Sequence, residues 1–257
     1  MVLKNGDFVR INFTGKIRET GEVFDTTYED VAKANNIYEP NLIFKARPVV
    51  IGARHVLPGI DKSLVGAELG DKTKIDVAPE DGFGKRDPAK IKVIPTREFK
   101  KRGVDPAVGM HVELDDAVGR VQSVGGGRVR VDLNHGLAGK VLEYEVKIEE
   151  KVNKKEEKIR QLLELYMPGV DSQEFKITVK EKTVEIVLPD ILRVDPSATV
   201  GKISAVRDIF TFIDAVDEVD YKDVHRRTTP SDKKKQKAQK QRKPTAASKP
   251  TTESKSA

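Results

Sequence analysis

The stretch Val56-Leu57-Pro58-Gly59-Ile60 stands between a predicted strand, residues 48–52, and a predicted short helix. Proline near the first turn suits a helix start, because its φ is already helical and the N–H it lacks would have no partner there. Ile60 and Leu64 are four residues apart and share one face, and Gly66 stands just beyond the helix end. The pattern predicts a compact helix that lies across a sheet.

Alternating side chains predict the first strand of that sheet. Val9, Ile11 and Phe13 occupy every second position, as in a half-buried strand with one face turned inward. Thr20-Gly21 then marks a hairpin turn. Residues 29–37 can form a short helix, which we interpret as a local elaboration of the fold.

A segment much later in the chain completes the sheet. Residues 72–77 and 142–148 alternate with the same period, so we expect two antiparallel strands that are separated in sequence by an insertion. Within the insertion, Gly125-Gly126-Gly127 separates two alternating segments, residues 120–124 and 128–131. The insertion is therefore predicted to contain a β-hairpin or meander.

The chain changes character after residue 151. Apolar side chains at helical spacing predict a helix within residues 156–167, and Pro168-Gly169 ends it. A hairpin, a second helix and a last strand follow, over residues 175–188, 198–213 and 216–224. We expect an α-β-β-α-β unit.

Composition limits the possible chemistry. The chain has 257 residues and no cysteine, which excludes disulfides, thiolate nucleophiles and thiolate metal sites. Its net charge is +6, but residues 226–257 alone hold eleven Lys or Arg and two acids. That segment has no aromatic or branched aliphatic side chain, so we expect a disordered basic tail.

Several signals are missing from the sequence. No run approaches the roughly 20 apolar residues of a membrane span, and the first residues lack the apolar stretch of a signal peptide, so we expect a cytoplasmic protein without a membrane partner. No glycine-rich segment completes a nucleotide-binding motif. The spacing of the histidines does not suit a metal site, so we expect neither metal nor cofactor; they are His55, His111, His135 and His225.

Taken together, these residues resemble a known family, the FKBP-type peptidyl-prolyl isomerases. The motifs that carry the resemblance are Phe13, Phe24-Asp25, Val56-Leu57-Pro58-Gly59-Ile60, Asp81-Gly82-Phe83-Gly84 and Tyr144. A minimal member of that family needs only a short flap between Gly84 and Tyr144, whereas this chain has about sixty residues there. This length, and the segment from Asn134 to Lys140, resemble the SlyD-like and long archaeal members.

The resemblance implies an α+β fold in which an FKBP-like antiparallel half-barrel wraps on a short helix. An inserted small β-rich domain and the C-terminal α-β-β-α-β domain would complete it. The domain limits that we expect are 1–87 plus 136–151 for the isomerase domain, 88–135 for the insert-in-flap chaperone domain, 153–225 for the C-terminal domain and 226–257 for the tail.

The resemblance also implies which residues form the isomerase site. The expected aromatic wall is Phe13, Phe24 and Tyr144, and the expected floor, which presents backbone hydrogen bonds, is Val56, Leu57 and Ile60. Asp25 would be the pocket carboxylate. Phe83 stands where the family usually has tyrosine and Ile60 where it often has tryptophan, so we expect activity to survive at a reduced level.

Such a site needs no covalent chemistry. An X-Pro bond rotates slowly because twisting it costs amide resonance, with a barrier of roughly 18 to 20 kcal/mol. An apolar pocket that strips water from the planar amide should favour the twisted state, which has lost its conjugated charge separation. A thousandfold acceleration requires only about 4 kcal/mol.

We therefore expect a peptidyl-prolyl cis-trans isomerase with chaperone activity, acting on unfolded or nascent proline-containing polypeptides. The insert would hold these chains near the proline pocket. Candidate contacts are Ile94, Phe99, Met110, Val121, Val129 and Leu137.

Alternatives remain open at this point. One is a chaperone with little isomerase activity, and another is a folding factor that docks on ribosomes or RNA through the basic residues from Lys233 to Lys243. The C-terminal domain could also mediate homodimer formation.

Overall fold

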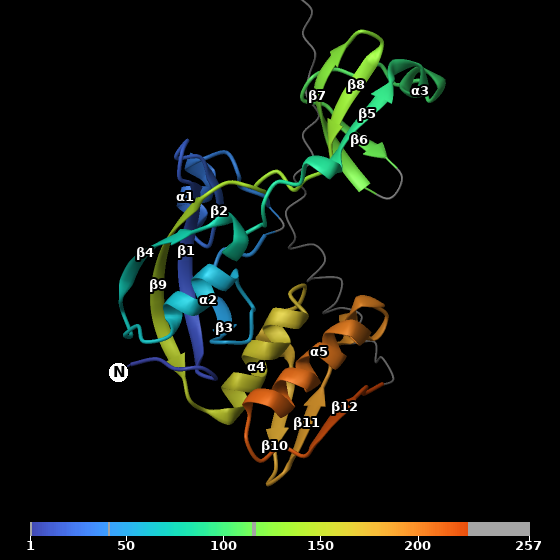
Figure 1. The fold of residues 1–257 in the computed structure, drawn as a ribbon. Helices are drawn as coiled ribbons and strands as arrows, with labels where there is room; N and C mark the ends of the chain where they lie inside the picture. The colour runs from blue at the N-terminus through green and yellow to red at the C-terminus, as the bar shows by residue number, and fades with distance from the viewer. Residues whose placement is uncertain (1, 41, 115–116, 226–257) are drawn as a thin grey trace, which may run out of the picture.

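The computed structural model describes residues 2–40, 42–114 and 117–225, which form three sheets (Figure 1). The first sheet, a half-barrel, has strands β1 (Phe8–Ile17), β2 (Val23–Thr26), β3 (Arg47–Val50), β4 (Lys72–Val77) and β9 (Leu142–Val152). Its order is β2-β1-β9-β4, β3 also pairs with β1, and all pairs are antiparallel. The predicted α+β fold with an FKBP-like half-barrel is confirmed.

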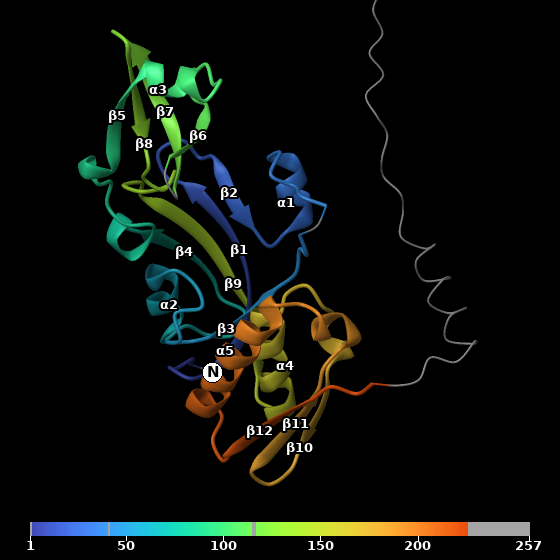
Figure 2. The same ribbon diagram turned by 90° about the vertical axis from the view of Figure 1, so that its right-hand side faces the viewer.

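Helix α2 (Pro58–Leu64) packs on β4 of the half-barrel, and α1 (Glu29–Ala34) follows β2 (Figures 1 and 2). Pro58 is in the first turn of α2, as predicted. Ile60 and Leu64 are buried in one core with the inward side chains of β1. A single 3-10 turn, Pro79–Asp81, follows β4.

Strands β4 and β9 are neighbours although the insert separates them in sequence. Ile75 is opposite Tyr144, and Val77 is opposite Leu142. The matching alternation of the two segments predicted this pairing, which brings both ends of the insert to the same edge of the half-barrel.

The insert forms a second sheet, which stands away from the half-barrel in Figure 1. Its elements are the 3-10 turn Pro88–Lys90, β5 (Ile91–Pro95), α3 (Thr96–Lys101), β6 (His111–Leu114), β7 (Ala117–Gly125) and β8 (Arg128–Asp132). The strand order is β5-β8-β7-β6. The β7–β8 hairpin turns at the predicted glycine run. Strand β5 and helix α3 lie in the first half of the insert, which contains Pro88, Pro95 and Pro106.

Hydrogen bonds join the two connections of the insert to each other. The N–H of Gly139 donates to the carbonyl of Gly84 at 2.8 Å. The Asn134 side chain donates to the carbonyl of Asp87 and accepts from its N–H, both at 2.9 Å. The insert is therefore attached through a bonded neck rather than through two independent linkers.

The C-terminal unit contains a three-stranded sheet with two helices on one face (Figure 2). Its elements are α4 (Lys155–Tyr166), the 3-10 turn Ser172–Glu174, β10 (Lys176–Val179), β11 (Thr183–Val187), the 3-10 turn Asp190–Arg193, α5 (Ser197–Phe212) and β12 (Glu218–Lys222). β10 pairs antiparallel with β11, and β12 pairs parallel with β11. The α-β-β-α-β order is as predicted.

The two helices of this unit pack closely. A Cβ on Gly201 of α5 would lie 2.6 Å from the carbonyl oxygen of Tyr166 at the end of α4. Glycine at this position therefore allows the two helix backbones to approach each other.

The C-terminal unit also packs directly on the half-barrel. Phe8 of β1 and Val50 of β3 are buried in the core that α4 and α5 form. Arg10, on the same face of β1 as Phe8, donates two hydrogen bonds to the Glu164 carboxylate, at 3.2 and 2.8 Å. The prediction of one inward face for β1 is thus corrected, because both faces are covered at its start.

Within the described ranges, no helix is long and apolar enough to cross a membrane. The predicted disordered tail, residues 226–257, lies outside the described residues together with its Lys233–Lys243 segment.

Candidate functional site

Four aromatic side chains from distant parts of the chain meet on the core of the half-barrel. β1 supplies Phe13, β2 supplies Phe24, β9 supplies Tyr144, and the loop after β4 supplies Phe83. The Phe24 ring centroid is 5.7 Å from that of Tyr144 and 6.3 Å from that of Phe83, and Phe13 is 5.8 Å from Tyr144. Tilted and edge-on rings at these distances attract each other. We call these four residues the aromatic cluster.

Gly15 makes room for the aromatic cluster. It pairs with Tyr144 in the β1–β9 ladder. A Cβ at this position would lie 2.8 Å from Cε1 of Tyr144 and 2.9 Å from Cζ of Phe24. A larger residue would therefore displace two of the four rings.

The loop before α2 is held by a buried carboxylate of that helix. Asp61 accepts hydrogen bonds from the N–H of Gly52 at 2.8 Å and from the N–H of Arg54 at 3.1 Å. The carbonyl of Leu57 accepts the N–H groups of the first turn, from Ile60 at 2.9 Å and Asp61 at 3.0 Å. These bonds fix the path of residues 52–57 below the aromatic cluster.

The floor of the site combines apolar side chains with a free backbone donor. Val56 and Leu57 are half-buried and pack on the same core as the aromatic cluster. Ile60 is only 2% exposed, so its side chain is core rather than open floor. Among the described residues, the Leu57 N–H has no hydrogen-bond partner, and a carbonyl group from outside could accept it.

Asp25 and Arg47 bring charge to the edge of the aromatic cluster. Burial raises the pKa of Asp25, and the positive charge of Arg47 and the backbone N–H of Thr26 offset this only in part. Burial also raises the pKa of Tyr144, with a further contribution from the negative charge of Asp25. The Tyr144 hydroxyl is therefore neutral at physiological pH and keeps its proton to donate.

All eight residues predicted for the isomerase site lie in this region. Seven of them belong to one hydrophobic core or pack against it, namely Phe13, Phe24, Val56, Leu57, Ile60, Phe83 and Tyr144. The eighth, Asp25, interacts with Tyr144 and lines a cavity with Phe13.

His135 was not predicted as part of this region. Its ring stacks on Phe83 with centroids 4.4 Å apart and planes within 7°. Leu137, two residues further on, packs against the core of the half-barrel. The segment from Asn134 to Lys140 shows no helix or strand periodicity, and only its resemblance to SlyD-like proteins indicated its importance.

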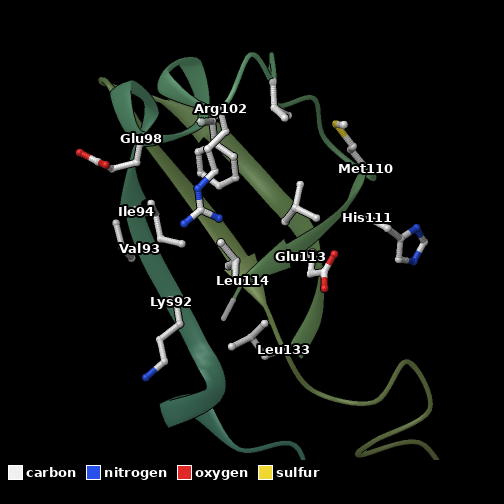
Figure 3. Close-up of a pocket in the computed structure, with 13 residues that line it drawn as sticks. Lys92, Val93, Ile94, Glu98, Arg102, Met110, His111, Glu113, Leu114 and Leu133 are labelled. Carbon is white, nitrogen blue, oxygen red and sulfur yellow. The ribbon is translucent and has the colours of Figure 1, made fainter. Parts of the chain in front are cut away.

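A second candidate region is a pocket of about 660 Å³ in the insert, between β5, α3 and β6. Figure 3 shows Ile94, Leu114 and Leu133 around its interior, with Arg102 reaching over them from the end of α3. Met110 and His111 lie at the rim, directly before and at the first residue of β6. The pocket offers apolar side chains together with charged groups of both signs, Lys92 and Arg102 against Glu98 and Glu113.

Only some of the predicted client contacts line this pocket. Ile94 and Met110 do, and so does the largely buried Phe99. Val121 and Val129 do not line it, because the central strands β7 and β8 turn them into the core of the insert, with 1% and 0% exposed. Their burial places them in the insert's own core, and their role as client contacts stays a prediction.

The described residues contain no group of three or more His, Cys, Asp or Glu side chains that could hold a metal ion.

An antiparallel half-barrel on one short helix, with aromatic side chains converging beside a half-buried carboxylate, defines the FKBP-like class of folds.

Comparison with protein families agrees region by region. The family described as FKBP-type peptidyl-prolyl cis-trans isomerase matches residues 2–100. The family described as FKBP26, IF domain, matches residues 92–137, and the FKBP26 C-terminal family matches residues 155–226.

Individual relatives point the same way. A short-type peptidyl-prolyl cis-trans isomerase of Methanocaldococcus jannaschii is 31% identical over 147 residues, which cover 57% of this chain and 92% of the relative. A probable FKBP-type 16 kDa isomerase of Pseudomonas fluorescens is 33% identical, over 51% of this chain and 79% of the relative. The SlyD isomerase of Haemophilus influenzae is 35% identical, over 38% and 53%. The chain belongs to the FKBP-type peptidyl-prolyl cis-trans isomerase family.

Proposed function

We propose that the half-barrel binds a proline residue against the aromatic cluster and rotates the X-Pro bond of unfolded or nascent polypeptides. The observation that carries this proposal is the convergence of Phe13, Phe24, Phe83 and Tyr144 on the core that contains α2. These side chains come from separate strands and one loop. The half-buried Phe24 and Phe83 offer an apolar surface to a proline ring, and Phe13 and Tyr144, each 3% exposed, support them from the core.

The proposed mechanism is desolvation combined with directed hydrogen bonds. The apolar rings exclude water from the planar amide, which favours the less polar twisted state. The free N–H of Leu57 and the hydroxyl of Tyr144 are donors that could hold substrate carbonyls in place during rotation. About 4 kcal/mol from these sources would accelerate rotation a thousandfold.

Isomerisation of a short proline peptide, followed by NMR exchange, tests this proposal. We expect catalytic amounts of the protein to accelerate exchange, and we expect Phe24→Ala to lower kcat/KM at least tenfold. Leu69→Ala, which shortens an exposed side chain outside the aromatic cluster, serves as the control. An exchange rate that the wild-type protein leaves unchanged would refute the proposal.

A chaperone with little turnover is the second candidate. Two observations favour it: Phe83 has no hydroxyl to donate, and Ile60 is buried rather than open to a ligand. The same exchange measurement separates the two candidates when it is combined with an aggregation assay. Suppressed aggregation without accelerated exchange would select the second.

We further propose that the insert binds unfolded clients at its pocket. Among the residues that the structure describes, β5 and β6 are the edge strands of their sheet, so each has backbone groups on one side that no neighbouring strand pairs. An extended client could add backbone hydrogen bonds there, while its apolar side chains enter the pocket near Ile94 and Leu114.

A matched pair of substitutions tests the client pocket. Met110 and Val124 have similar exposure, 39% and 41%, but only Met110 lines the pocket. Met110→Glu should weaken suppression of client aggregation severalfold, whereas Val124→Glu should not. Equal effects of the two substitutions would argue against the pocket.

The C-terminal unit offers a surface for a second copy of the chain. Ile203 and Phe210 are exposed on one face of α5, with Val200 beside them. We propose that this stripe forms a two-fold homodimer contact. Sedimentation of the Ile203→Glu variant tests this contact, and we expect a shift from dimer to monomer.

We also propose that the three units are domains with the limits 1–87 plus 136–151, 88–135 and 153–225.

A further inference from the structure

A cavity of about 500 Å³ lies between the half-barrel and the C-terminal unit. Phe13, Asp25 and the segment 42–48 line it on one side, and Leu165 and Pro168 line it on the other. We call it the interdomain groove. Its volume lies within the range of roughly 300 to 1,000 Å³ that is usual for ligand pockets.

The walls of the interdomain groove are held together by ionic contacts to the buried carboxylate of Glu164. Glu164, one residue before Leu165, accepts two hydrogen bonds from Arg10 of β1, and its carboxylate is 2.8 Å from Nζ of Lys45. Burial opposes ionisation of Glu164, but the hydrogen bonds from Arg10 and Lys45 outweigh it, so the pKa of Glu164 is lowered. The end of α4 is thus tied to both β1 and the segment 42–48.

A second set of contacts holds the end of α4 beside the loop that leads to α2. His55 is 2.9 Å from Asp208 of α5, and the Tyr166 hydroxyl is bonded to both. Because Nδ1 of His55 accepts the N–H of Val50, Nε2 carries the proton that it shares with Asp208. Tyr166 directly follows Leu165, so this wall of the groove is positioned from two sides.

The lining of the groove is mainly apolar. Leu42 and Ile43 are 55% and 63% exposed, and Phe44 beside them stacks on Tyr38 with ring centroids 5.5 Å apart. Together with Leu165 and Pro168 across the groove, these side chains form an exposed apolar surface, which is unusual on a protein without a partner there. Charged side chains line the groove in two places, at Asp25 and Arg47 beside the aromatic cluster and at the ion pair of Lys45 with Glu164.

We propose that the interdomain groove binds the substrate polypeptide next to its proline and selects a bulky apolar side chain there. Phe13 belongs to the aromatic cluster and also lines the groove, so the two sites are continuous. An extended chain advances about 3.3 to 3.6 Å per residue, so a chain whose proline lies on the aromatic cluster passes Asp25 and enters the groove within a few residues. The inference rests on the proposed proline site, to which it adds a specificity pocket that the C-terminal unit completes.

Two peptides with the same Ala-Pro centre test this proposal. One carries leucine at the two residues before Ala and at the two residues after Pro, and the other carries serine at these four positions. We expect the wild-type protein to prefer the leucine peptide about tenfold in kcat/KM, mainly through a lower KM. Ile43→Glu should reduce the preference to twofold or less. Ile191→Glu, at 62% exposure and outside the groove, should retain it.

Photo-crosslinking provides a readout that does not depend on turnover. A benzophenone side chain replaces leucine in the peptide, and mass spectrometry locates its attachment. We expect attachment within residues 42–48 and 165–169. Equal kcat/KM for both peptides with attachment elsewhere would overturn the groove but leave the isomerase proposal standing. If neither peptide isomerises faster, the isomerase proposal fails, and the attachment site alone decides whether the groove binds the chain.

Discussion

Asp25 combines partial burial with a nearby positive charge, and its position beside Tyr144 places it at the junction of the aromatic cluster and the interdomain groove. Burial raises its pKa despite the charge of Arg47. Ionising this carboxyl group therefore costs more free energy in the folded protein than in the unfolded chain. A residue kept at such a cost is more consistent with ligand binding than with stability.

Asp25→Asn should stabilise the fold at neutral pH. Because the folded-state pKa is the higher one, the folded protein holds the proton more tightly, and the contribution of Asp25 to stability falls as pH rises through the two pKa values. Urea unfolding should show a higher midpoint for the variant at about pH 7 and no gain at about pH 3, where the carboxyl group is protonated in both states. Asp30→Asn, on the exposed face of α1, is the control, and the same gain at both pH values would contradict the prediction.

Gly15→Ala should disturb the aromatic cluster. Its Cβ would lie within 3.0 Å of atoms of both Tyr144 and Phe24, so these rings must move. We expect a loss of about 1 to 3 kcal/mol in unfolding free energy, as for other overpacked sites, and a lower kcat/KM on short proline peptides. Gly136→Ala adds a Cβ in open space and should change neither quantity.

Among the elements, the neck of the insert decides where its pocket is held relative to the half-barrel. Gly84 and Gly139 are bonded at its base, and Asn134 bridges to Asp87 near its upper end. An ion pair joins Arg86 to Asp132, the last residue of β8. These bonds keep the pocket of the insert and the aromatic cluster at a defined separation. This separation matters if a client that is bound at the pocket is then bound at the aromatic cluster.

Asn134→Ala should uncouple the insert from the half-barrel. The variant loses both hydrogen bonds to Asp87, so the insert samples more orientations. We expect its activity in refolding a proline-limited protein to fall severalfold, while its kcat/KM on short peptides stays within about twofold of wild type. Lys90→Ala, an exposed side chain next to the neck, is the control. Parallel losses on both substrates would contradict this account.

At the scale of the whole molecule, the C-terminal unit is part of the half-barrel's packing rather than an appendage. Its core includes Phe8 and Val50, and its helices bear the acceptors for Arg10 and His55. Burial favours the neutral form of Asp208, but hydrogen bonds from Tyr166, Arg207 and His55 outweigh it, so its pKa is lowered. The unit therefore stabilises the surface of the half-barrel that lies beside the proline site.

Truncation after Val152 should destabilise the half-barrel. It exposes Phe8 and Val50, and burial of each such side chain contributes about 1.5 to 3 kcal/mol, so we expect a loss of about 3 to 6 kcal/mol measured by urea unfolding. Phe8→Ser should improve the solubility of the truncated chain but destabilise the full one. A truncated chain as stable as the parent would contradict the proposed role.

Much of the half-barrel follows from short-range patterns. The alternation in residues 72–77 and 142–148, and the proline at the start of α2, predict a pairing and a helix that the structure confirms. The resemblance to FKBP-type motifs named the residues that meet in the aromatic cluster. Strand β5 and helix α3 were not predicted, because each is short and the prolines around them interrupt the hydrophobic periodicity.

The sequence by itself determined the order of the elements outside the first half of the insert, the family and the side chains that form the aromatic cluster. Only the tertiary structure decided that Phe8 and Arg10 face the C-terminal unit, that Val121 and Val129 face the core of the insert, and that residues 42–48 meet the end of α4. The physical reason is that periodicity tells which side chains share a face. Which faces then meet depends on how surfaces far apart in the chain fit together.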